Sequence, residues 1–302
     1  MAGRISLPRK TMMTALDRVR ALPIWSGPVD PVPLEGGITN VNFRVQDGAR
    51  RVMVRVGTDI PVHHVMRFNE LAASRAAHAA GISPAVLYHE PGILVLDWIE
   101  GRSLSAADVA APGMLERVLP LLARCHRDIP THLRGPSLVF WVFHTIRDYA
   151  ATLREGGSRH AAQLPDLLAQ AAKLEAATGA IDLVFGHNDL LPANLMEDGS
   201  RLWLIDWDYA GWNSPLFDLG GLSANCSLSS AQECWLLESY YDRTPTADLL
   251  HRYHAMKAAA ALREALWSMV SELHSELDVN FAAYTEKTLA AWRAAHDHFT
   301  QS

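Results

Sequence analysis

Apolar and polar side chains alternate in short runs over the first hundred residues, and this pattern predicts β-strands. The clearest case is the segment VNFRVQDGARRVMVRVG, residues 41–57, in which two alternating runs flank the pair Asp47-Gly48. An Asp-Gly pair between two such runs is the sequence signal of a hairpin with a two-residue turn. We therefore expect two antiparallel strands joined at Asp47-Gly48.

The remainder of this region predicts one helix and two more strands. Residues 61–80 are rich in helix-forming residues and are followed by Gly81, a residue type that commonly ends helices. Residues 85–88 and 93–98 are short apolar runs bounded by turn-forming residues, which is typical of strands.

Beyond Gly101 the spacing of apolar residues changes to that of helices. Residues 114–127, MLERVLPLLARCHR, place apolar side chains three or four positions apart, and residues 246–273 repeat the pattern. Two short apolar stretches, residues 183–185 and 201–206, interrupt the helical pattern and predict strands on either side of a loop.

This change of pattern divides the chain into two predicted units. The chain of 302 residues is long enough for two hydrophobic cores, and the strand-rich pattern ends near Trp98. We expect a first unit over residues 1–98 and a second over residues 99–302. The sequence leaves the oligomeric state open.

Composition and charge argue against several classes of protein. The formal net charge is −6 and Lys and Arg form no continuous run, which argues against a dedicated nucleic-acid binder. The apolar runs are shorter than the roughly 18 residues of a membrane span, and the N-terminal stretch lacks the apolar core of a secretory signal. The 3 cysteines form no CxxC pair and fit a reducing compartment, so we expect a cytoplasmic protein without membrane association.

The densest group of polar residues lies in and after the predicted loop of the second unit. FGHNDLLPANL and LIDWDYAG together give the order H-x-D-x-x-x-x-N followed by an Asp at a strand end, the pattern that protein kinases use for phosphoryl transfer. Asp189 can accept the proton of an attacking hydroxyl, and the oxygen atoms of Asn194 and Asp206 suit Mg²⁺. His187 would organise the loop. The alternative is that these polar residues only form turns, in which case they would match this spacing by accident.

The segments GHNDLLPANL and IDWDYAG are similar to those of the choline/ethanolamine kinase family, within the wider aminoglycoside phosphotransferase-like group of small-molecule kinases. The DFG motif of protein kinases is replaced by Asp206-Trp207-Asp208, which points away from protein substrates. The resemblance implies an ATP:alcohol phosphotransferase that uses ATP and Mg²⁺. It also implies an α+β, protein-kinase-like fold of two lobes, a small antiparallel sheet with one main helix and a larger, mostly helical lobe.

The resemblance extends to the nucleotide side of the site. LEGGITNVNFRV is similar to the family's phosphate-covering loop, in which glycines let the backbone approach the nucleotide. Arg55 stands where protein kinases have a strand Lys, Glu70 is its expected ion-pair partner, and LVLDWIEG would be the hinge that recognises adenine. An exposed strand arginine and a solvated glutamate are the alternative for this pair. The residues implied on this side are Gly36, Gly37, Thr39, Asn40, Arg55, Glu70, Asp97 and Ile99.

The acceptor side is implied by ALWSMV and VNFAAYTEK, which resemble family segments that line an aromatic cage for a quaternary ammonium group. Glu264 stands where the family often has a second Trp, and a carboxylate there still favours a cation, such as a primary amine. Asp208 stands where Glu is usual, which shortens the reach of that carboxylate. Aromatic residues at helical spacing are equally typical of a helix core, so cage and core remain alternatives. The residues implied on this side are Asp189, Asp208, Tyr209, Trp212, Glu264, Trp267, Phe281 and Tyr284.

Two further groups of residues have more modest roles. Asp218, in PLFDLGG, resembles a family position that supports the catalytic loop from a helix. His63 and His64 belong to no cluster with the ligand spacing of a zinc site, so we expect core or surface roles for them.

The sequence therefore predicts ATP-dependent phosphorylation of the hydroxyl of a small amino alcohol, with choline as the first candidate and ethanolamine beside it. Thiamine and aminoglycosides are alternative acceptors for the same chemistry. The alternative of another class is a nucleotide-binding regulatory protein without catalysis, which would bind ATP but turn over none of these acceptors.

Overall fold

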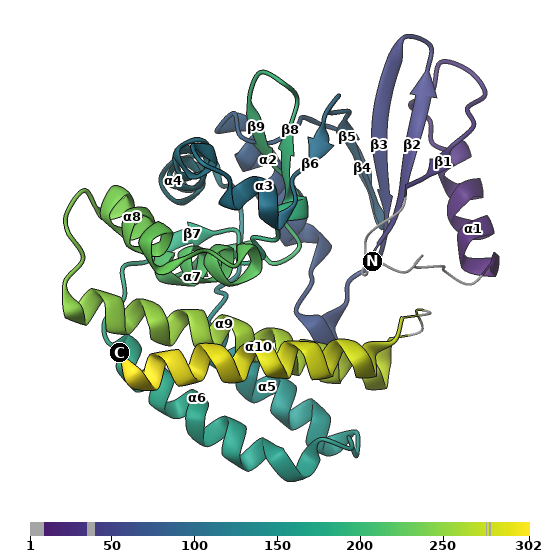
Figure 1. Ribbon diagram of the computed structural model, residues 1–302. Coiled ribbons are helices and arrows are strands. Elements are labelled where there is room, and N and C mark those ends of the chain that lie inside the picture. Colours follow the sequence, from purple (N-terminus) through teal and green to yellow (C-terminus); the bar gives the residue numbers. More distant parts are fainter. Residues whose placement is uncertain (1–8, 35–39, 276, 278) are drawn as a thin grey trace.

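The computed structural model describes residues 9–34, 40–275, 277 and 279–302. Its first part is a five-stranded antiparallel sheet with the strand order β1-β2-β3-β5-β4 (Figure 1). The strands are β1 (Val32–Pro33), β2 (Val41–Asp47), β3 (Arg50–Val56), β4 (Val86–Glu90) and β5 (Ile93–Asp97). The pairs predicted from residues 41–57 and from residues 85–98 are thus confirmed as strands of one sheet.

The hairpin of β2 and β3 turns one residue later than predicted. Asp47 still pairs with Arg50 at the end of the ladder, so the turn consists of Gly48 and Ala49. Gly48 has a φ of +60°, a left-handed conformation that glycine adopts without strain. Asp47 stays in the strand because its carboxylate accepts hydrogen bonds from Ser26 and Arg50.

The predicted helix over residues 61–80 begins later than expected. The chain first makes a short 3-10 turn, η1 (Pro61–His63), and Met66 is extended, so the helix α2 (Arg67–Ala79) forms only after it. The end of the helix agrees with the prediction, because Gly81 follows with a φ of +71°.

A further helix, α1 (Arg9–Arg20), packs on the sheet and was not predicted from the pattern. Ala15 and Val19 lie four positions apart on one helix face and share a buried cluster with the strand residues Phe43 and Val54.

The second part is mostly helical. The long helices α9 (Ala247–His274) and α10 (Phe281–Gln301) lie side by side, with α5 and α6 packed on α9 (Figure 1). The helical predictions for residues 114–127 and 246–273 are confirmed by α4 and α9. The remaining helices are α3 (Ala106–Ala110), α4 (Met114–His132), α5 (Val142–Glu155), α6 (Leu164–Thr178), α7 (Pro215–Cys226) and α8 (Ser230–Tyr241), with the 3-10 turns η2 (Ala161–Gln163) and η3 (Pro192–Asn194).

Two small antiparallel sheets lie within this helical part. The strands are β6 (Arg102–Ser103), β7 (Val184–Gly186), β8 (Leu195–Glu197), β9 (Leu202–Leu204) and β10 (Gly211–Asn213). β7 pairs with β10, whereas β8 lies between β6 and β9. The predicted strands at residues 183–185 and 201–206 are therefore present, and they belong to separate sheets on either side of the predicted loop.

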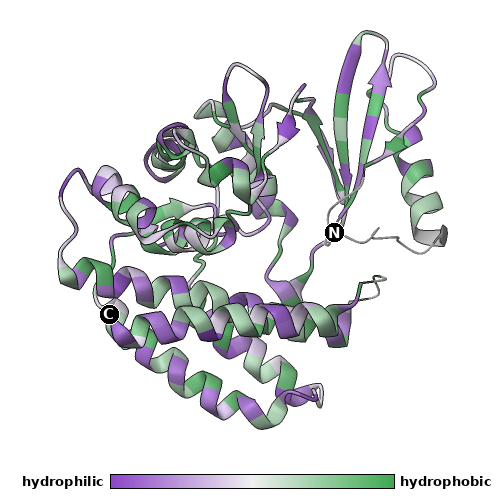
Figure 2. Cartoon of the chain, viewed as in Figure 1, coloured by the Kyte–Doolittle hydropathy of each residue, from purple (hydrophilic) through white to green (hydrophobic). Residues whose placement is uncertain are grey.

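Helix α2 joins the two parts through packing. Figure 2 shows apolar and polar residues alternating around the helices, and the apolar side chains of α2, such as Ala73 and Ala77, share a buried core with Val118 and Leu122 of α4. This contact fixes α2 against the helical part and places Glu70, in its first turn, beside the sheet. The sheet itself ends at Asp97; a division into units at residue 98 remains our proposal.

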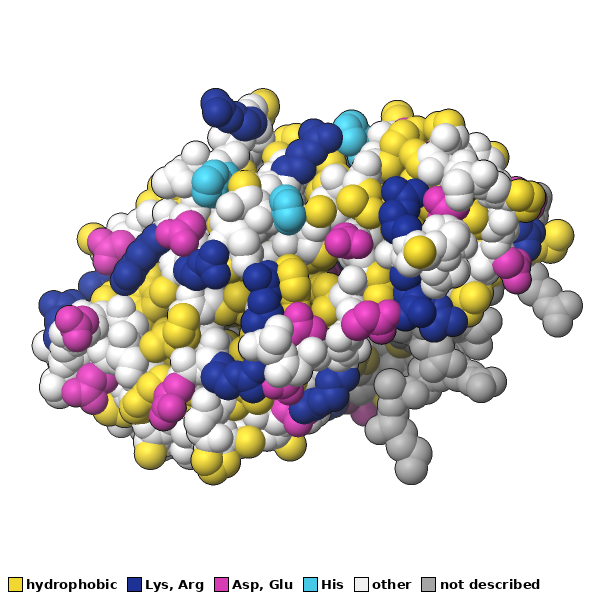
Figure 3. Space-filling model, turned by 90° about the horizontal axis from the view of Figure 1, so that it is seen from above, with side chains coloured by type: hydrophobic (Ala, Val, Ile, Leu, Met, Phe, Trp, Pro, Cys, Tyr) yellow, Lys and Arg dark blue, Asp and Glu magenta, His cyan; other side chains and the backbone are white. Residues whose placement is uncertain are grey.

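The surface carries both signs of charge. On the face seen in Figure 3, Lys and Arg side chains are interspersed with Asp and Glu side chains over a partly apolar surface. Among the described residues, no helix combines the length and the apolar character needed to cross a membrane.

Candidate active site

The loop between β7 and β8 is held rigidly by one buried carboxylate. Asp218 of α7 accepts hydrogen bonds from the backbone N–H groups of His187 and Asn188, both at 2.8 Å, and lies 3.0 Å from Nε2 of His126. Burial would raise the pKa of Asp218, but these donors hold it below its usual value. The expectation that Asp218 supports this loop thus has a direct geometric basis.

Two side chains of the loop serve its shape. The buried His187 ring lies 2.9 Å from the Ile205 carbonyl through Nε2, accepts from the Asp189 N–H at 3.3 Å, and packs on Trp207. Burial lowers the pKa of His187 and so favours the neutral ring. Asn188, which the sequence interpretation passed over, has a φ of +62° and donates to the carbonyl of Tyr209 at 3.0 Å. Asn tolerates this left-handed conformation better than most residues, which was the signal available in the sequence.

The side chain of Asp189 lines a cavity, and its carboxyl group has a raised pKa. Burial raises its pKa to about 7, against the opposing effect of the Arg263 guanidinium, whose Nη1 lies 4.0 Å from Oδ1. The side chain of Asn194 donates to the Asp189 carbonyl at 2.9 Å and so ties the two predicted site residues together. A carboxylate with a pKa near neutrality can exchange a proton at physiological pH.

A cluster of two arginines and three carboxylates joins the sheet to the loop after β9. Nη1 of Arg55 lies 2.7 Å from Glu70, 2.9 Å from Asp206 and 3.2 Å from Asp208. The expected ion pair between Arg55 and Glu70 is therefore present. Burial would raise the pKa of Asp206, but Arg55 holds it below its usual value.

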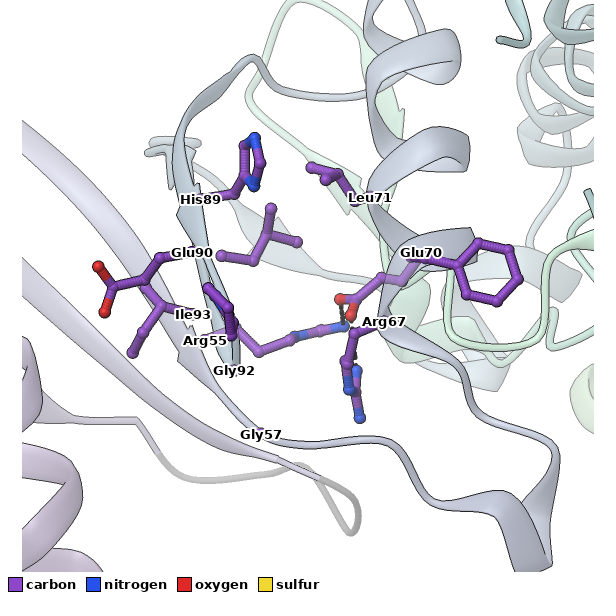
Figure 4. Close-up of a pocket in the computed structure, with 12 residues that line it drawn as sticks. Arg55, Gly57, Arg67, Glu70, Leu71, His89, Glu90, Gly92 and Ile93 are labelled. Carbon is purple, nitrogen blue, oxygen red and sulfur yellow. Dashed lines mark hydrogen bonds and ion pairs between the residues drawn. The ribbon is translucent and has the colours of Figure 1, made fainter. Parts of the chain in front are cut away.

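The second arginine of this cluster, Arg67, was not predicted. Its Nη1 lies 2.6 Å from Glu70 and 2.8 Å from Asp208, and Figure 4 shows Arg55 and Arg67 converging on Glu70 at a cavity of about 280 Å³. The three-residue spacing of Arg67 and Glu70 on one helix face was the available signal. Asp206 has a φ of +70°, a strained backbone conformation of the kind found at functional sites.

A cavity of about 320 Å³ lies between the sheet and the loop. Both predicted hinge residues, Asp97 and Ile99, line it, and so do the predicted metal ligands Asn194 and Asp206. Asn40 is buried and donates from Nδ2 to Asp208 at 3.1 Å. Gly36, Gly37 and Thr39 lie outside the described residues.

A second cavity of about 320 Å³ opens on the other side of the loop. Of the residues expected on the acceptor side, Asp189, Glu264 and Tyr284 line it, and the Tyr284 hydroxyl donates to Glu264 at 2.7 Å. Arg263 and Lys287 also line this cavity and were not predicted. The sequence signal for Arg263 was a charged residue within the long apolar run of α9.

The remaining aromatic candidates are packed inside the protein. Trp267, Phe281 and Tyr209 are each less than 10 % exposed, and Nε1 of Trp267 donates to the Tyr209 hydroxyl at 2.9 Å. Trp212, on β10, packs on Phe185 and donates to Ser137, away from this group. The structure therefore brings three rings together but gives only Tyr284 a place in the cavity wall.

Comparison with known proteins matches most of the chain to a family. The family model for choline/ethanolamine kinase matches residues 32–253. Protein LicA of Haemophilus influenzae is 28% identical over 273 residues, which cover 85% of this chain and 77% of that protein. Ethanolamine kinase 2 of Mus musculus is 26% identical over 285 residues, covering 82% of this chain and 71% of that protein.

Solved structures agree with this match. A choline/ethanolamine kinase family protein from Mesorhizobium loti superposes with a TM-score of 0.76 at 27% identity, covering 94% of each chain. The choline kinase LicA from Streptococcus pneumoniae superposes with a TM-score of 0.75 at 21% identity, over 94% of this chain and 99% of that one, and so supports the fold. The expected kinase-like α+β architecture is confirmed.

Proposed function

The chain belongs to the choline/ethanolamine kinase family and is a small-molecule kinase that uses ATP, and we propose that it phosphorylates the hydroxyl of a small amino alcohol. Choline and ethanolamine are the candidate acceptors, because the similar proteins include a choline kinase and several ethanolamine kinases. The products would be ADP and the phosphate ester of the alcohol.

The position of Asp189 carries this proposal. Its side chain lines the acceptor-side cavity, while Asn194, which is hydrogen-bonded to it, lines the nucleotide-side cavity. A hydroxyl bound in the first cavity would therefore meet the terminal phosphate of a nucleotide bound in the second. Asp189 would accept the hydroxyl proton as the oxygen attacks phosphorus, which its pKa of about 7 permits near neutral pH.

The arginine cluster supports a role in binding phosphate. Among the described residues, Nε of Arg55 and Nη2 of Arg67 are buried without a hydrogen-bond partner. An unpaired buried donor is costly, and phosphate oxygens would satisfy both. We propose that Arg55 and Arg67 hold the nucleotide phosphates while Glu70 keeps both side chains in place.

Mg²⁺ is the metal that this chemistry implies, and the side chains present fit it. Asn194 and Asp206 offer amide and carboxylate oxygens, the ligands that Mg²⁺ prefers. The described residues contain no group of three or more His, Cys, Asp or Glu side chains arranged for a metal. This suits Mg²⁺, which uses few protein ligands together with phosphates and water. The ion would neutralise charge that develops on the phosphates.

Release of ADP tests the proposal directly. The protein is incubated with ATP and Mg²⁺ and with choline, ethanolamine, thiamine or an aminoglycoside, and the Asp189→Asn variant serves as the blank. We expect turnover with choline or ethanolamine that is lost in the variant. Turnover with thiamine or the aminoglycoside alone would overturn the acceptor assignment, and ATP binding without turnover of any acceptor would favour a regulatory protein.

A further inference from the structure

The acceptor-side cavity contains a buried cation of the protein's own. Arg263 is only 4% exposed, and its guanidinium carbon lies 4.3 Å from the ring centre of Tyr209 and 5.6 Å from that of Phe140. Nη1 lies 3.0 Å from Glu264 and 4.0 Å from Asp189. The guanidinium is thus held between two aromatic rings and two carboxylates, beside the proposed catalytic Asp189.

Trp267 and Phe281, two other rings expected on the acceptor side, are also covered. The Trp267 ring lies 5.0 Å from the His63 ring at an interplanar angle of 33°, so His63 partly covers one of its faces. Phe281 packs against the same indole at 6.1 Å and is only 5% exposed. The group of rings is therefore filled by the protein's own side chains.

Quaternary and primary ammonium groups need different surroundings. A quaternary ammonium has no N–H group and is bound through open aromatic faces, whereas a primary ammonium has three donors and needs oxygen acceptors. The cavity wall offers acceptors in Glu264 and in the Tyr284 hydroxyl, which are hydrogen-bonded to each other at 2.7 Å. Tyr209, one of the rings expected on the acceptor side, already carries the Arg263 guanidinium over its face.

We infer that Arg263 selects the acceptor: its guanidinium covers the Tyr209 ring, excludes quaternary ammonium groups, and leaves Glu264 and Tyr284 to bind a primary ammonium group. This inference rests on the proposed function, because it concerns the choice among amino alcohols. It reverses the sequence-based order of candidates and places ethanolamine-type acceptors before choline. Specificity of this kind comes from a group that repels the wrong ligand as well as from one that attracts the right ligand.

The test compares two variants at one position. Arg263→Met removes the charge and keeps an unbranched side chain, whereas Arg263→Lys keeps the charge but loses the planar guanidinium and so separates the effect of the charge from that of stacking. The kcat/KM for ethanolamine and for choline is measured with ATP and Mg²⁺ for the unmodified protein and both variants. We use the ratio of the two values because removing a charge beside Asp189 changes the rate with both acceptors.

We expect the unmodified protein to favour ethanolamine by about tenfold or more, the factor expected from a modest cation–π contribution. Arg263→Met is expected to shift the ratio toward choline by about tenfold, while Arg263→Lys stays close to the unmodified protein. An unmodified protein that favours choline, or an unchanged ratio in Arg263→Met, would overturn the inference. Faster turnover of serine or homoserine, lost in Arg263→Met, would also overturn it and make Arg263 a carboxylate-binding residue.

A second measurement decides the inference if the variant does not fold or if the proposed reaction is not observed. If Arg263→Met does not fold, choline is tested as an inhibitor of ethanolamine turnover by the unmodified protein. Weak inhibition supports the inference. Inhibition at choline concentrations similar to the KM for ethanolamine contradicts it. If neither acceptor is turned over, the proposed function fails separately. Calorimetric titration with choline then decides the inference, with binding expected for Arg263→Met and not for the unmodified protein.

Discussion

The two ends of the site are built in different ways. At the nucleotide end, Arg55 and Arg67 link carboxylates from α2 and from the loop after β9, so each charge has partners. At the acceptor end, Arg263 lies between aromatic rings and touches carboxylates that also line an open cavity. We propose that the first arrangement holds phosphates and metal, which are common to all kinases, and that the second determines which alcohol enters. The predictions below test this separation of roles.

The largest effect is expected where the two ends meet. Asp189→Asn removes the group proposed to accept the hydroxyl proton and is expected to lower kcat by roughly 10²–10⁴-fold, the usual contribution of such a group. Nucleotide affinity, measured by calorimetric titration with ADP, is expected to stay near that of the unmodified protein. Asp166→Asn, on the exposed side of α6, is the matched control and is expected to keep full activity. Equal loss of ADP binding and of folding would contradict a catalytic role.

At the nucleotide end, removing one arginine is expected to affect stability strongly. Arg55→Met leaves Asp206 without its ion-pair partner and Glu70 with Arg67 alone, and breaking a buried ion pair in this way costs about 3–5 kcal/mol. Urea unfolding at pH 7 measures the change in the free energy of unfolding.

The control for this experiment lies on the same strand. Arg51 pairs with Glu100, and both side chains are exposed, so Arg51→Met is expected to change the free energy of unfolding by no more than about 1 kcal/mol. Similar losses for Arg55→Met and Arg51→Met would show that the nucleotide-end cluster is not the tightly held structure described above.

At the acceptor end, we expect an effect on binding of the alcohol and none on binding of the nucleotide. Glu264→Gln removes the carboxylate proposed to hold the ammonium group, and a hydrogen bond to a charged group contributes about 1.5–3 kcal/mol, or roughly 10–150-fold in kcat/KM. Ethanolamine kinetics at saturating ATP measure the loss. A KM for ATP that rises in parallel would mean that the two ends are not separate.

The smallest effect concerns pH and the histidine that covers Trp267. Burial lowers the pKa of His63 to about 3 from an ordinary value of 6.5, so the unfolded chain binds a proton that the folded protein does not. The free energy of unfolding therefore falls as the pH drops below 6.5, and at pH 5 protonation of this residue in the unfolded chain has lowered it by about 2 kcal/mol.

His63→Gln isolates this contribution. We expect its free energy of unfolding to fall by about 2 kcal/mol less than that of the unmodified protein between pH 7 and pH 5. His132→Gln, at an exposed position, is the control and is expected to keep the pH dependence of the unmodified protein. Identical pH dependence in all three proteins would show that His63 can be protonated in the folded state.

The two ends also differ in how far the sequence predicts them. Asp189, Asn194 and Asp206 lie within eighteen residues, and their spacing is imposed by one loop and the short strands β8 and β9, so a local pattern indicates them. The same holds for the β2–β3 hairpin, whose turn was misplaced by one residue because side-chain bonds of Asp47 favoured a later turn. Local chemistry sets such features, and local sequence predicts them.

The acceptor end depends on packing between distant segments. Tyr209 follows β9, Arg263 lies on α9 and Tyr284 on α10, so they meet only through tertiary packing, including that of α9 against α10. The sequence indicated which aromatic residues were present, but not that Arg263 would cover Tyr209 or that Trp267 would be buried. Tertiary packing decides which ring faces stay open, and a pattern of residue types along the chain does not reveal this packing.

One competition experiment tests the central claim, that one end transfers phosphate and the other selects a primary amino alcohol. The protein is given ATP, Mg²⁺ and equal concentrations of ethanolamine and choline, and ³¹P NMR identifies the phosphate esters formed. The account predicts phosphoethanolamine as the main product. Mainly phosphocholine would contradict the proposed selection by Arg263, and no phosphate ester of either alcohol would contradict the proposed reaction itself.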